Sequence, residues 1–284
     1  MITVPEFKKR KVDQKKISMV TCYDSSFARM LNGSPIDVLL VGDSSAMVMN
    51  GYDSTIHADV EMIATHTRAV SRGAPSKFIV ADMPFLSVRK GLIQAVEAAG
   101  ELLRAGAHAV KIEGIEGNEE IIRHLVKSGV PVMGHLGLTP QFVNAFGGMK
   151  VQAKTQAEQD RLRNDARFFE DCGAFSLVLE CVPNSIATKI TESLSIPTIG
   201  IGAGAGTDGQ VLVLQDLLGF DPGFKPKFLR KYFNAHEAFT RAFEQFHADV
   251  QTGGFPKLSE SYESDLEPKK NAGGLFHASP TIDA

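Results

Sequence analysis

Five ionisable side chains each come at, or directly after, the end of a short apolar run in this sequence. They are Asp43, Asp82, Glu113, His135 and Glu180. Taken singly, Asp43 reads as a helix cap, His135 as a hydrogen-bonded core histidine and Glu113 as a charge at a rim. Burying all of these groups among apolar strands without partners would be costly. The repetition therefore favours a shared site over unrelated structural roles.

The residue types in this set indicate the chemistry of a hard divalent cation. Asp43, Asp82 and Glu113 supply carboxylates, and Mg²⁺ prefers oxygen ligands while keeping positions for water or substrate oxygens. Lys111 lies two residues before Glu113, which places it on the same side of an extended strand. A lysine in that place suits a substrate carboxylate or a developing oxyanion, with a paired lysine that fills the fold as the alternative.

Two groups of the set suit proton transfer. Glu180 is separate in sequence from the metal-type acids, and a carboxylate in its position suits a proton acceptor. His135 is expected to position substrate or to relay a proton. Both roles require the strand ends to lie close together in space.

Eight short apolar runs provide elements that could bring these side chains together. The runs cover residues 17–23, 38–41, 78–81, 109–114, 130–138, 175–179, 197–202 and 211–214. Most connections between them carry the apolar spacing of helices, which indicates an α/β protein with a parallel sheet. The pattern favours a (β/α)₈ TIM-type barrel as a single domain over residues 1–257, with a doubly wound sheet as the competitor. The carboxyl ends of barrel strands converge at one mouth, where such folds carry their active sites.

Capping residues mark several of the connecting helices. Asp24 precedes a helical pattern that ends near Gly33, and Asp59 precedes the next one. Thr155 and Glu158 have the spacing of a capping box. The sequence therefore predicts helices beginning after each of these caps.

The last part of the chain carries weaker signals. Residues 204–209 fit G-x-G-x-x-G, but they follow a late strand and precede an apolar run, so a turn or phosphate-facing barrel loop is favoured over a dinucleotide site. Residues 227–250 are expected to form one long amphipathic helix whose aromatic stripe serves as core or subunit interface. Residues 258–284 are polar and aperiodic, which predicts a disordered C-terminal tail.

Composition and charge narrow the functional classes. The chain has 284 residues, is 43% hydrophobic and carries a formal net charge of −3, so it lacks a strong basic field for nucleic acid or an anionic membrane. The basic cluster at residues 8–11 with Lys15 and Lys16 is interpreted as a solvated face. Three widely spaced cysteines argue against a disulfide framework, and we find no apolar run of signal-peptide or membrane-span type. We expect a soluble cytoplasmic protein with no nucleic-acid and no membrane partner.

Several sequence blocks together closely resemble the ketopantoate hydroxymethyltransferase (3-methyl-2-oxobutanoate hydroxymethyltransferase) family over about residues 5–256. The blocks are TCYD at 21–24, VGDS at 41–44, GYDST at 51–55, ADMPF at 81–85, VKIEG at 110–114, GHLGLTPQ at 134–141, LECVP at 179–183 and IGIGAG at 199–204. The resemblance implies a barrel enzyme that binds Mg²⁺ and forms a large homo-oligomer, typically a decamer. It implies transfer of a one-carbon unit from 5,10-methylenetetrahydrofolate to 3-methyl-2-oxobutanoate at the start of pantothenate biosynthesis.

Motif position within this family also implies roles for individual residues. The metal-associated acids would be Asp43, Asp82 and Glu113. The contacts to the keto acid would be Asp43, Ser44, Asp82 and Lys111. Glu180 would be the proton acceptor.

Two other functions are weighed against this one. The first is another Mg²⁺-dependent barrel acting on an enolate, such as a lyase of the isocitrate lyase type. Those lyases carry a loop cysteine that acts as acid or base, whereas Cys181 adjoins a strand end. The second is a non-catalytic homologue, which should have lost some of the strand-end groups.

Overall fold

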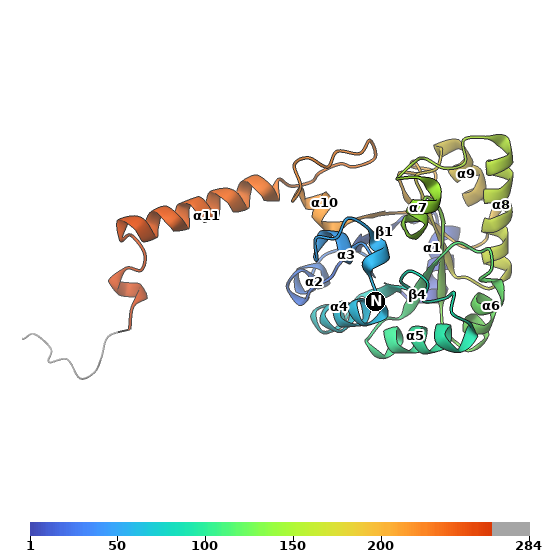
Figure 1. The fold of residues 1–284 in the computed structure, drawn as a ribbon, viewed down its shortest axis with the longest axis horizontal. Helices are drawn as coiled ribbons and strands as arrows, with labels where there is room; N and C mark the ends of the chain where they lie inside the picture. The colour runs from blue at the N-terminus through green and yellow to red at the C-terminus, as the bar shows by residue number, and fades with distance from the viewer. Residues whose placement is uncertain (263–284) are drawn as a thin grey trace, which may run out of the picture. The chain divides into compact units, whose positions relative to one another are not determined.

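A computed structural model describes residues 1–262 of the chain, which divides into two compact units, Met1–Asn234 and the part from Ala235 onward. The first unit contains a closed parallel barrel whose strands are hydrogen-bonded in sequence order, with β1 also paired to β8 (Figure 1). The strands are β1 Ile17–Thr21, β2 Val38–Val41, β3 Phe78–Asp82, β4 Ala109–Glu113, β5 Val132–Gly137, β6 Ser176–Glu180, β7 Thr198–Ile201 and β8 Gly209–Leu212. The predicted (β/α)₈ barrel is confirmed, and the doubly wound sheet is wrong.

Helices connect most of these strands on the outside of the barrel, and Figure 1 shows α4, α5, α6 and α8 around it. The helices are α2 Ser25–Asn32, α3 Ser45–Val48, α4 Val60–Gly73, α5 Leu92–Arg104, α6 Glu119–Lys127, α7 Val143–Phe146, α8 Gln156–Asp171, α9 Asn184–Ser193 and α10 Leu214–Leu218. Asp24 accepts hydrogen bonds from two backbone amides at the start of α2, and Asp59 does so once at the start of α4. The predicted capping box of Thr155 and Glu158 opens α8. All of these predicted helix starts are confirmed.

The strands are buried on both faces, which explains their continuous apolar runs. In β2, Val38 and Leu40 belong to the core inside the barrel, whereas Leu39 and Val41 pack with the outer helices. The alternation follows from the two-residue period of a strand. Asp43 comes after β2 has ended, and its amide donates a hydrogen bond to Asp82 at the end of β3.

The predicted eighth strand, at residues 211–214, is displaced from the observed one. β8 begins at Gly209, which pairs with Ile17 of β1, and Leu214 already begins α10. A Cβ at Gly209 would lie 2.4 Å from the carbonyl oxygen of Ile17, so only glycine allows this approach. The sequence predicts a later start for β8 because its first two residues, Gly209 and Gln210, are not apolar.

The glycine-rich segment at 204–209 joins β7 to β8 without a helix. A Cβ at Gly204 would lie 1.9 Å from the side chain of Asn184, and one at Gly206 would lie 2.0 Å from that of Thr188. These glycines therefore let the loop pack tightly on α9. The prediction of a turn rather than a dinucleotide fingerprint agrees with this packing.

An unpredicted helix, α1 Val4–Val12, lies at the amino ends of the strands. The ring of Phe7 is fully buried and packs edge-on against Phe78, at the start of β3, and against Phe175, just before β6. Because the segment is short and buries few apolar side chains, its periodicity is too weak to mark it as a helix. This helix covers the end of the barrel opposite the five strand-end groups.

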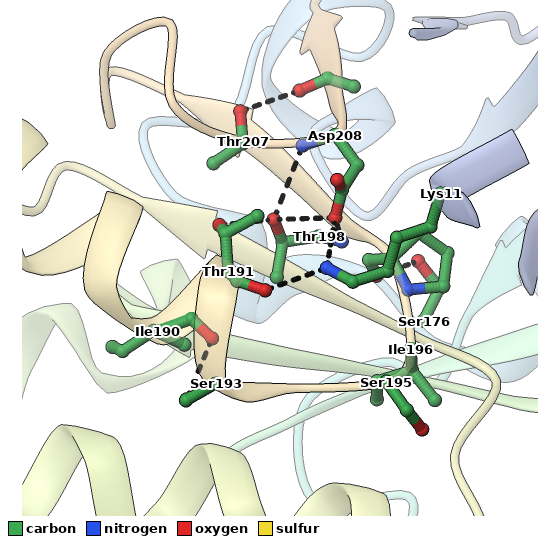
Figure 2. A network of polar contacts seen from close by, with 12 residues as sticks. Lys11, Ser176, Ile190, Thr191, Ser193, Ser195, Ile196, Thr198, Thr207 and Asp208 are labelled. Carbon is green, nitrogen blue, oxygen red and sulfur yellow. Dashed lines mark hydrogen bonds and ion pairs between the residues drawn. The ribbon is translucent and has the colours of Figure 1, made fainter. Parts of the chain in front are cut away.

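The basic cluster near the N-terminus is only in part a solvated face. Lys11 Nζ lies 2.7 Å from the carbonyl oxygen of Thr191 and 2.8 Å from Asp208 Oδ2, and Asp208 also accepts a 2.9 Å hydrogen bond from the amide of Thr198 (Figure 2). Arg10 forms a 2.8 Å ion pair with Asp37. The predicted solvated face is therefore wrong for these two residues, since partners on distant segments hold them.

The second unit contains α11 Ala235–Thr252 and a short 3₁₀ helix, Leu258–Glu260. The predicted helix at 227–250 is wrong in its first turns, because residues 227–234 are not helical and the amide of Tyr232 instead donates to the carbonyl of Leu217. On α11, Phe243 is 71% exposed and Phe246 is 58% exposed, so a subunit interface stays a prediction while a core role does not fit. The predicted tail beyond residue 262 lies outside the described residues.

Within residues 1–262, every helix is too short or too polar to cross a bilayer.

Candidate functional site

The five strand-end groups and Lys111 lie together at the mouth of the barrel, on consecutive strands β2 to β6. Asp43 follows β2, Asp82 ends β3, Lys111 and Glu113 are in β4, His135 is in β5 and Glu180 ends β6. The register places Asp82 beside Lys111 and Glu113 beside His135. The predicted convergence is confirmed, with one correction. His135 does not end its strand, because β5 continues for two residues until Gly137 pairs with Glu180.

Lys111 is buried at the centre of this group. Its Nζ lies 3.1 Å from Asp82 Oδ1, 3.7 Å from Glu113 Oε1 and 3.1 Å from His135 Nδ1. Burial by itself would lower the pKa of Lys111, but the surrounding carboxylates outweigh burial and raise it. Lys111 is therefore a fixed positive charge in a site nearly closed to solvent.

His135 bridges two carboxylates. Its Nδ1 lies 3.1 Å from Glu113 Oε1, and its Nε2 lies 3.2 Å from Glu180 Oε2. Burial and Lys111 both act to lower the pKa of His135, but Glu113 and Glu180 together raise it to about 9. The ring is thus an imidazolium at neutral pH, and a neutral core histidine is not what this environment favours.

Asp43 and Asp82 form a pair of buried carboxylates with too little positive charge around them. The amide of Asp43 donates a 3.0 Å hydrogen bond to Asp82 Oδ2. Burial raises the pKa of Asp43 well above its ordinary value, and the charges of Asp82 and Glu113 raise it further. Burial also raises the pKa of Asp82, although Lys111 opposes this. A bound cation would relieve this excess of negative charge.

Glu113 differs from Asp43 and Asp82 because its pKa is lowered rather than raised. Oε1 lies beside His135, and Oε2 accepts a 3.0 Å hydrogen bond from the amide of Gln141. Burial acts to raise the pKa of Glu113, but His135, Lys111 and the Gln141 amide lower it overall. Glu113 is therefore held as a carboxylate by protein groups.

The carboxylates at the mouth of the barrel bear on whether the site can hold a divalent cation. Among residues 1–262, no three His, Cys, Asp or Glu side chains are already arranged around a common metal position. Mg²⁺, however, commonly binds through one or two carboxylates together with water and substrate oxygens. The crowded, buried oxygens of Asp43 and Asp82 fit that pattern, so the chemistry of the site suits Mg²⁺. A ligand role for Glu113 stays a prediction.

Gln141 is a site residue that sequence reasoning missed. It lies in a 3₁₀ helix, Pro140–Phe142, after β5, and its Nε2 donates 2.8 Å to Asp43 Oδ2 and 3.0 Å to the carbonyl of Met83. With its amide on Glu113, it ties two acids from different strands to one loop. The signal that could have found it is its place at the end of the GHLGLTPQ block.

Sequence reasoning also missed Tyr23, whose side chain contacts Ser44. The phenol oxygen of Tyr23 lies 2.8 Å from Ser44 Oγ, and the whole Tyr23 side chain is buried. Burial raises the pKa of Tyr23, so the phenol stays neutral and can donate to the serine. Ser44 is thereby oriented beside Asp43, although its contact with a substrate stays a prediction.

Glu180 is the most accessible of the acids in the cluster. Its side chain is 16% exposed, whereas that of Glu113 is 1% exposed. Gly137 allows the chain to pass close to it, since a Cβ there would lie 2.2 Å from the Glu180 carbonyl oxygen. A carboxylate with this exposure, which lies 3.2 Å from His135 Nε2, can meet a substrate that enters from the mouth.

Known proteins resemble this chain over most of its length. The profile of the ketopantoate hydroxymethyltransferase family matches residues 1–258. The 3-methyl-2-oxobutanoate hydroxymethyltransferase of Bdellovibrio bacteriovorus is 53% identical, covering 92% of this chain and 100% of the relative. The enzyme of that name from Coxiella burnetii is 52% identical, covering 90% of this chain and 97% of the relative.

Solved structures show the same fold at much lower identity. A phosphonopyruvate hydrolase has a TM-score of 0.60 at 11% identity, covering 93% of this chain and 92% of its own. A 2,3-dimethylmalate lyase of the PEP mutase/isocitrate lyase superfamily has a TM-score of 0.57 at 15% identity, covering 94% and 93%. These two likenesses support the barrel fold alone. By its profile match and its close relatives, the chain belongs to the ketopantoate hydroxymethyltransferase family.

Proposed function

We propose that this protein transfers a hydroxymethyl group from 5,10-methylenetetrahydrofolate to 3-methyl-2-oxobutanoate, giving 2-dehydropantoate (ketopantoate) as the first step of pantothenate biosynthesis. The names of the close relatives support this substrate. The observation that carries the proposal is the 3.2 Å approach of His135 to Glu180 beside the buried Lys111. It sets a fixed base next to a fixed positive charge, which is what removal of a proton beside a carbonyl requires.

Mg²⁺ is the proposed metal, and Asp43 and Asp82 are its proposed protein ligands, with Glu113 as the third metal-associated acid. When bound, the metal would supply Lewis-acid polarisation of the keto acid. The excess of buried negative charge at Asp43 supports this assignment. Asp43, Ser44, Asp82 and Lys111 would contact the keto acid.

Glu180 is the proposed base that removes the proton from C3 of the keto acid. The His135 imidazolium holds the carboxylate of Glu180 in place, and Lys111 offsets the negative charge that develops on the keto oxygen. The new carbon–carbon bond then forms between C3 and the methylene carbon of the donor, while the bonds from that carbon to the folate nitrogens break. Water supplies the hydroxyl group, and the proton that water releases and the proton taken from C3 go to the two folate nitrogens.

Hydrogen–deuterium exchange at C3 of 3-methyl-2-oxobutanoate, with Mg²⁺ and without folate, tests the proposal. We expect exchange with the unaltered protein and its loss in Glu180→Gln. No exchange at high enzyme concentration would count against the proposal and would favour a non-catalytic homologue. Cleavage of a carbon–carbon bond in a 2-hydroxy diacid would favour a lyase instead.

The assembly and cellular location are proposals as well. The family resemblance suggests a homo-oligomer, with a decamer as the expected size, and a cytoplasmic location. Exposed phenylalanines on α11 support the first of these. Light scattering coupled to size-exclusion chromatography would measure the number of subunits, and a monomer would contradict it.

A further inference from the structure

Four neighbouring strands leave the mouth of the barrel through a residue in the left-handed backbone conformation. Gly114 follows β4 with a φ of 73°, Gly137 ends β5 with a φ of 92°, and Gly202 follows β7 with a φ of 64°. In β6 the corresponding residue is Cys181, with a φ of 47°. Glycine adopts a positive φ readily, whereas a residue with a Cβ is strained there. Cys181 is therefore the exception, and it directly follows Glu180, the proposed base.

The turn at Cys181 is held by hydrogen bonds to three other segments. The carbonyl oxygen of Glu180 accepts a 2.8 Å bond from the amide of Leu138, which comes just after β5. The amide of Cys181 donates a 2.8 Å bond to the carbonyl oxygen of Ile201, the last residue of β7, and its own carbonyl oxygen accepts a 2.9 Å bond from the amide of Gln152. A strained residue persists only where its surroundings determine its conformation, and these bonds do so here.

The side chain of Cys181 favours a single conformation of this turn. Its Sγ lies beside Gly202, since a Cβ on that glycine would lie 3.2 Å from Sγ and 3.0 Å from the ring of Phe228. A glycine at position 181 would leave the place of the thiol empty and would also open backbone regions that a residue with a Cβ avoids. The cysteine is thus strained but fixed, where a glycine would be relaxed but free to move.

The thiol group is poorly suited to proton transfer. Burial and the negative charge of Glu180 raise the pKa of Cys181 to about 11. The group therefore stays a neutral thiol at neutral pH. This leaves the conformation of Cys181, rather than its acidity, as the property that can affect the site.

We propose that Cys181 is a positioning residue for Glu180. Its left-handed backbone, fixed by the packed thiol, holds the peptide after Glu180 so that the carboxylate stays beside His135 and faces the keto acid. The carboxylate lies 3.2 Å from His135 Nε2 and is partly open to the mouth, so its direction depends on the backbone that carries it. This inference rests on the proposed function, and it adds how the chain holds the base in place.

Hydrogen–deuterium exchange at C3 of 3-methyl-2-oxobutanoate, without folate, tests this role in three variants of the full chain. Cys181→Val keeps an apolar side chain but is β-branched and resists a positive φ, so we expect its kcat for exchange to fall about a hundredfold. Cys181→Asn is polar but tolerates a positive φ, so it should keep the rate within about threefold. Cys181→Gly should lose about tenfold, because its turn is no longer fixed. The KM for the keto acid should stay within about twofold throughout, since the groups that would bind it are unchanged.

Gln14 provides the matched control. It has the same left-handed backbone, with a φ of 53°, but it is exposed and lies between α1 and β1, at the opposite end of the barrel. Gln14→Val and Gln14→Gly make the same backbone changes there. Both should leave the exchange rate within about twofold of the unaltered protein, because distant sites act independently.

The order of the variants separates positioning from simple packing. A faster rate in Cys181→Val than in Cys181→Asn would show that the thiol only fills apolar space, and it would overturn the proposal. Unchanged exchange in both Cys181→Val and Cys181→Gly would overturn it too, and so would a rise in KM that accounts for the whole loss. If Cys181→Val fails to fold, the rates of Cys181→Gly and Cys181→Asn still decide the question. In all of these cases exchange by the unaltered protein keeps the proposed function intact, whereas its absence would contradict that function and this role together.

Discussion

His135 and Glu180 are joined by a 3.2 Å contact between Nε2 and Oε2, while Nδ1 of the same ring lies 3.1 Å from Glu113. One imidazolium therefore fixes an accessible carboxylate and a buried one at once. Because β5 and β6 are neighbouring strands, the contact joins two rigid elements rather than two loops. The first two predictions follow from this bridge.

We expect His135→Asn to lower kcat about a hundredfold, in the range found for loss of a group that serves general base catalysis. The shorter side chain cannot reach both Glu113 and Glu180, so the base loses its fixed position. The KM for 3-methyl-2-oxobutanoate should change little, because Lys111 and the aspartates remain. Kinetics at saturating donor measure both constants. An unchanged kcat would contradict a positioning role for His135.

The stability of the protein should fall as the pH rises through the titration of His135. The folded state raises its pKa from 6.5 to about 9, so it stabilises the fold fully below pH 6.5 and loses this contribution as the pH passes through 9. The change is on the order of 3 kcal/mol, since one pKa unit corresponds to about 1.4 kcal/mol. Urea unfolding without Mg²⁺ between pH 6 and pH 10 measures it. A slope of the same size in His135→Gln would show that another group is responsible.

Much of the barrel and of its site could be predicted from the sequence because both obey local rules. Strands buried on two faces give uninterrupted apolar runs, and the polar residue after each run is visible without any structure. Asp43 and Asp82 were identified in this way. The contact between Lys111 and Glu113 followed from their spacing along a single strand.

Other features depend on contacts between distant segments, which local patterns do not reveal. Gln141 reaches Asp43 only because the loop after β5 folds over the mouth. Phe7 belongs to a helix with one buried ring, and its partners lie far along the chain. Gly209 begins a strand without an apolar side chain, because close approach to β1 decides its place.

The Gln141 side chain should set the affinity for Mg²⁺ although it need not touch the metal. Its Nε2 orients Asp43, and its amide holds Glu113. Loss of a group that orients a metal ligand weakens binding about tenfold to a hundredfold. We expect that loss for Gln141→Ala in calorimetric titration with Mg²⁺. Gln156→Ala is the control, because Gln156 is exposed and its side chain donates to Asp160 on the same helix. Equal affinities in the two variants would rule out this role.

Asp43→Asn should make the metal-free protein more stable and the metal-bound protein less so. Burial and the charges of Asp82 and Glu113 raise the pKa of Asp43, which means that its carboxylate is unfavourable where it lies. Removing that charge relieves the repulsion, and an amide of the same shape can still face Gln141. The variant also loses a proposed Mg²⁺ ligand, and a cation at a hundred times its Kd would stabilise the unaltered protein by about 2.7 kcal/mol.

Thermal unfolding with EDTA and with Mg²⁺ separates the two effects. We expect a higher Tm than the unaltered protein in EDTA, and no increase of that Tm on adding Mg²⁺. A lower Tm in EDTA, or a retained response to Mg²⁺, would mean that Asp43 does not carry the excess charge that the cation relieves.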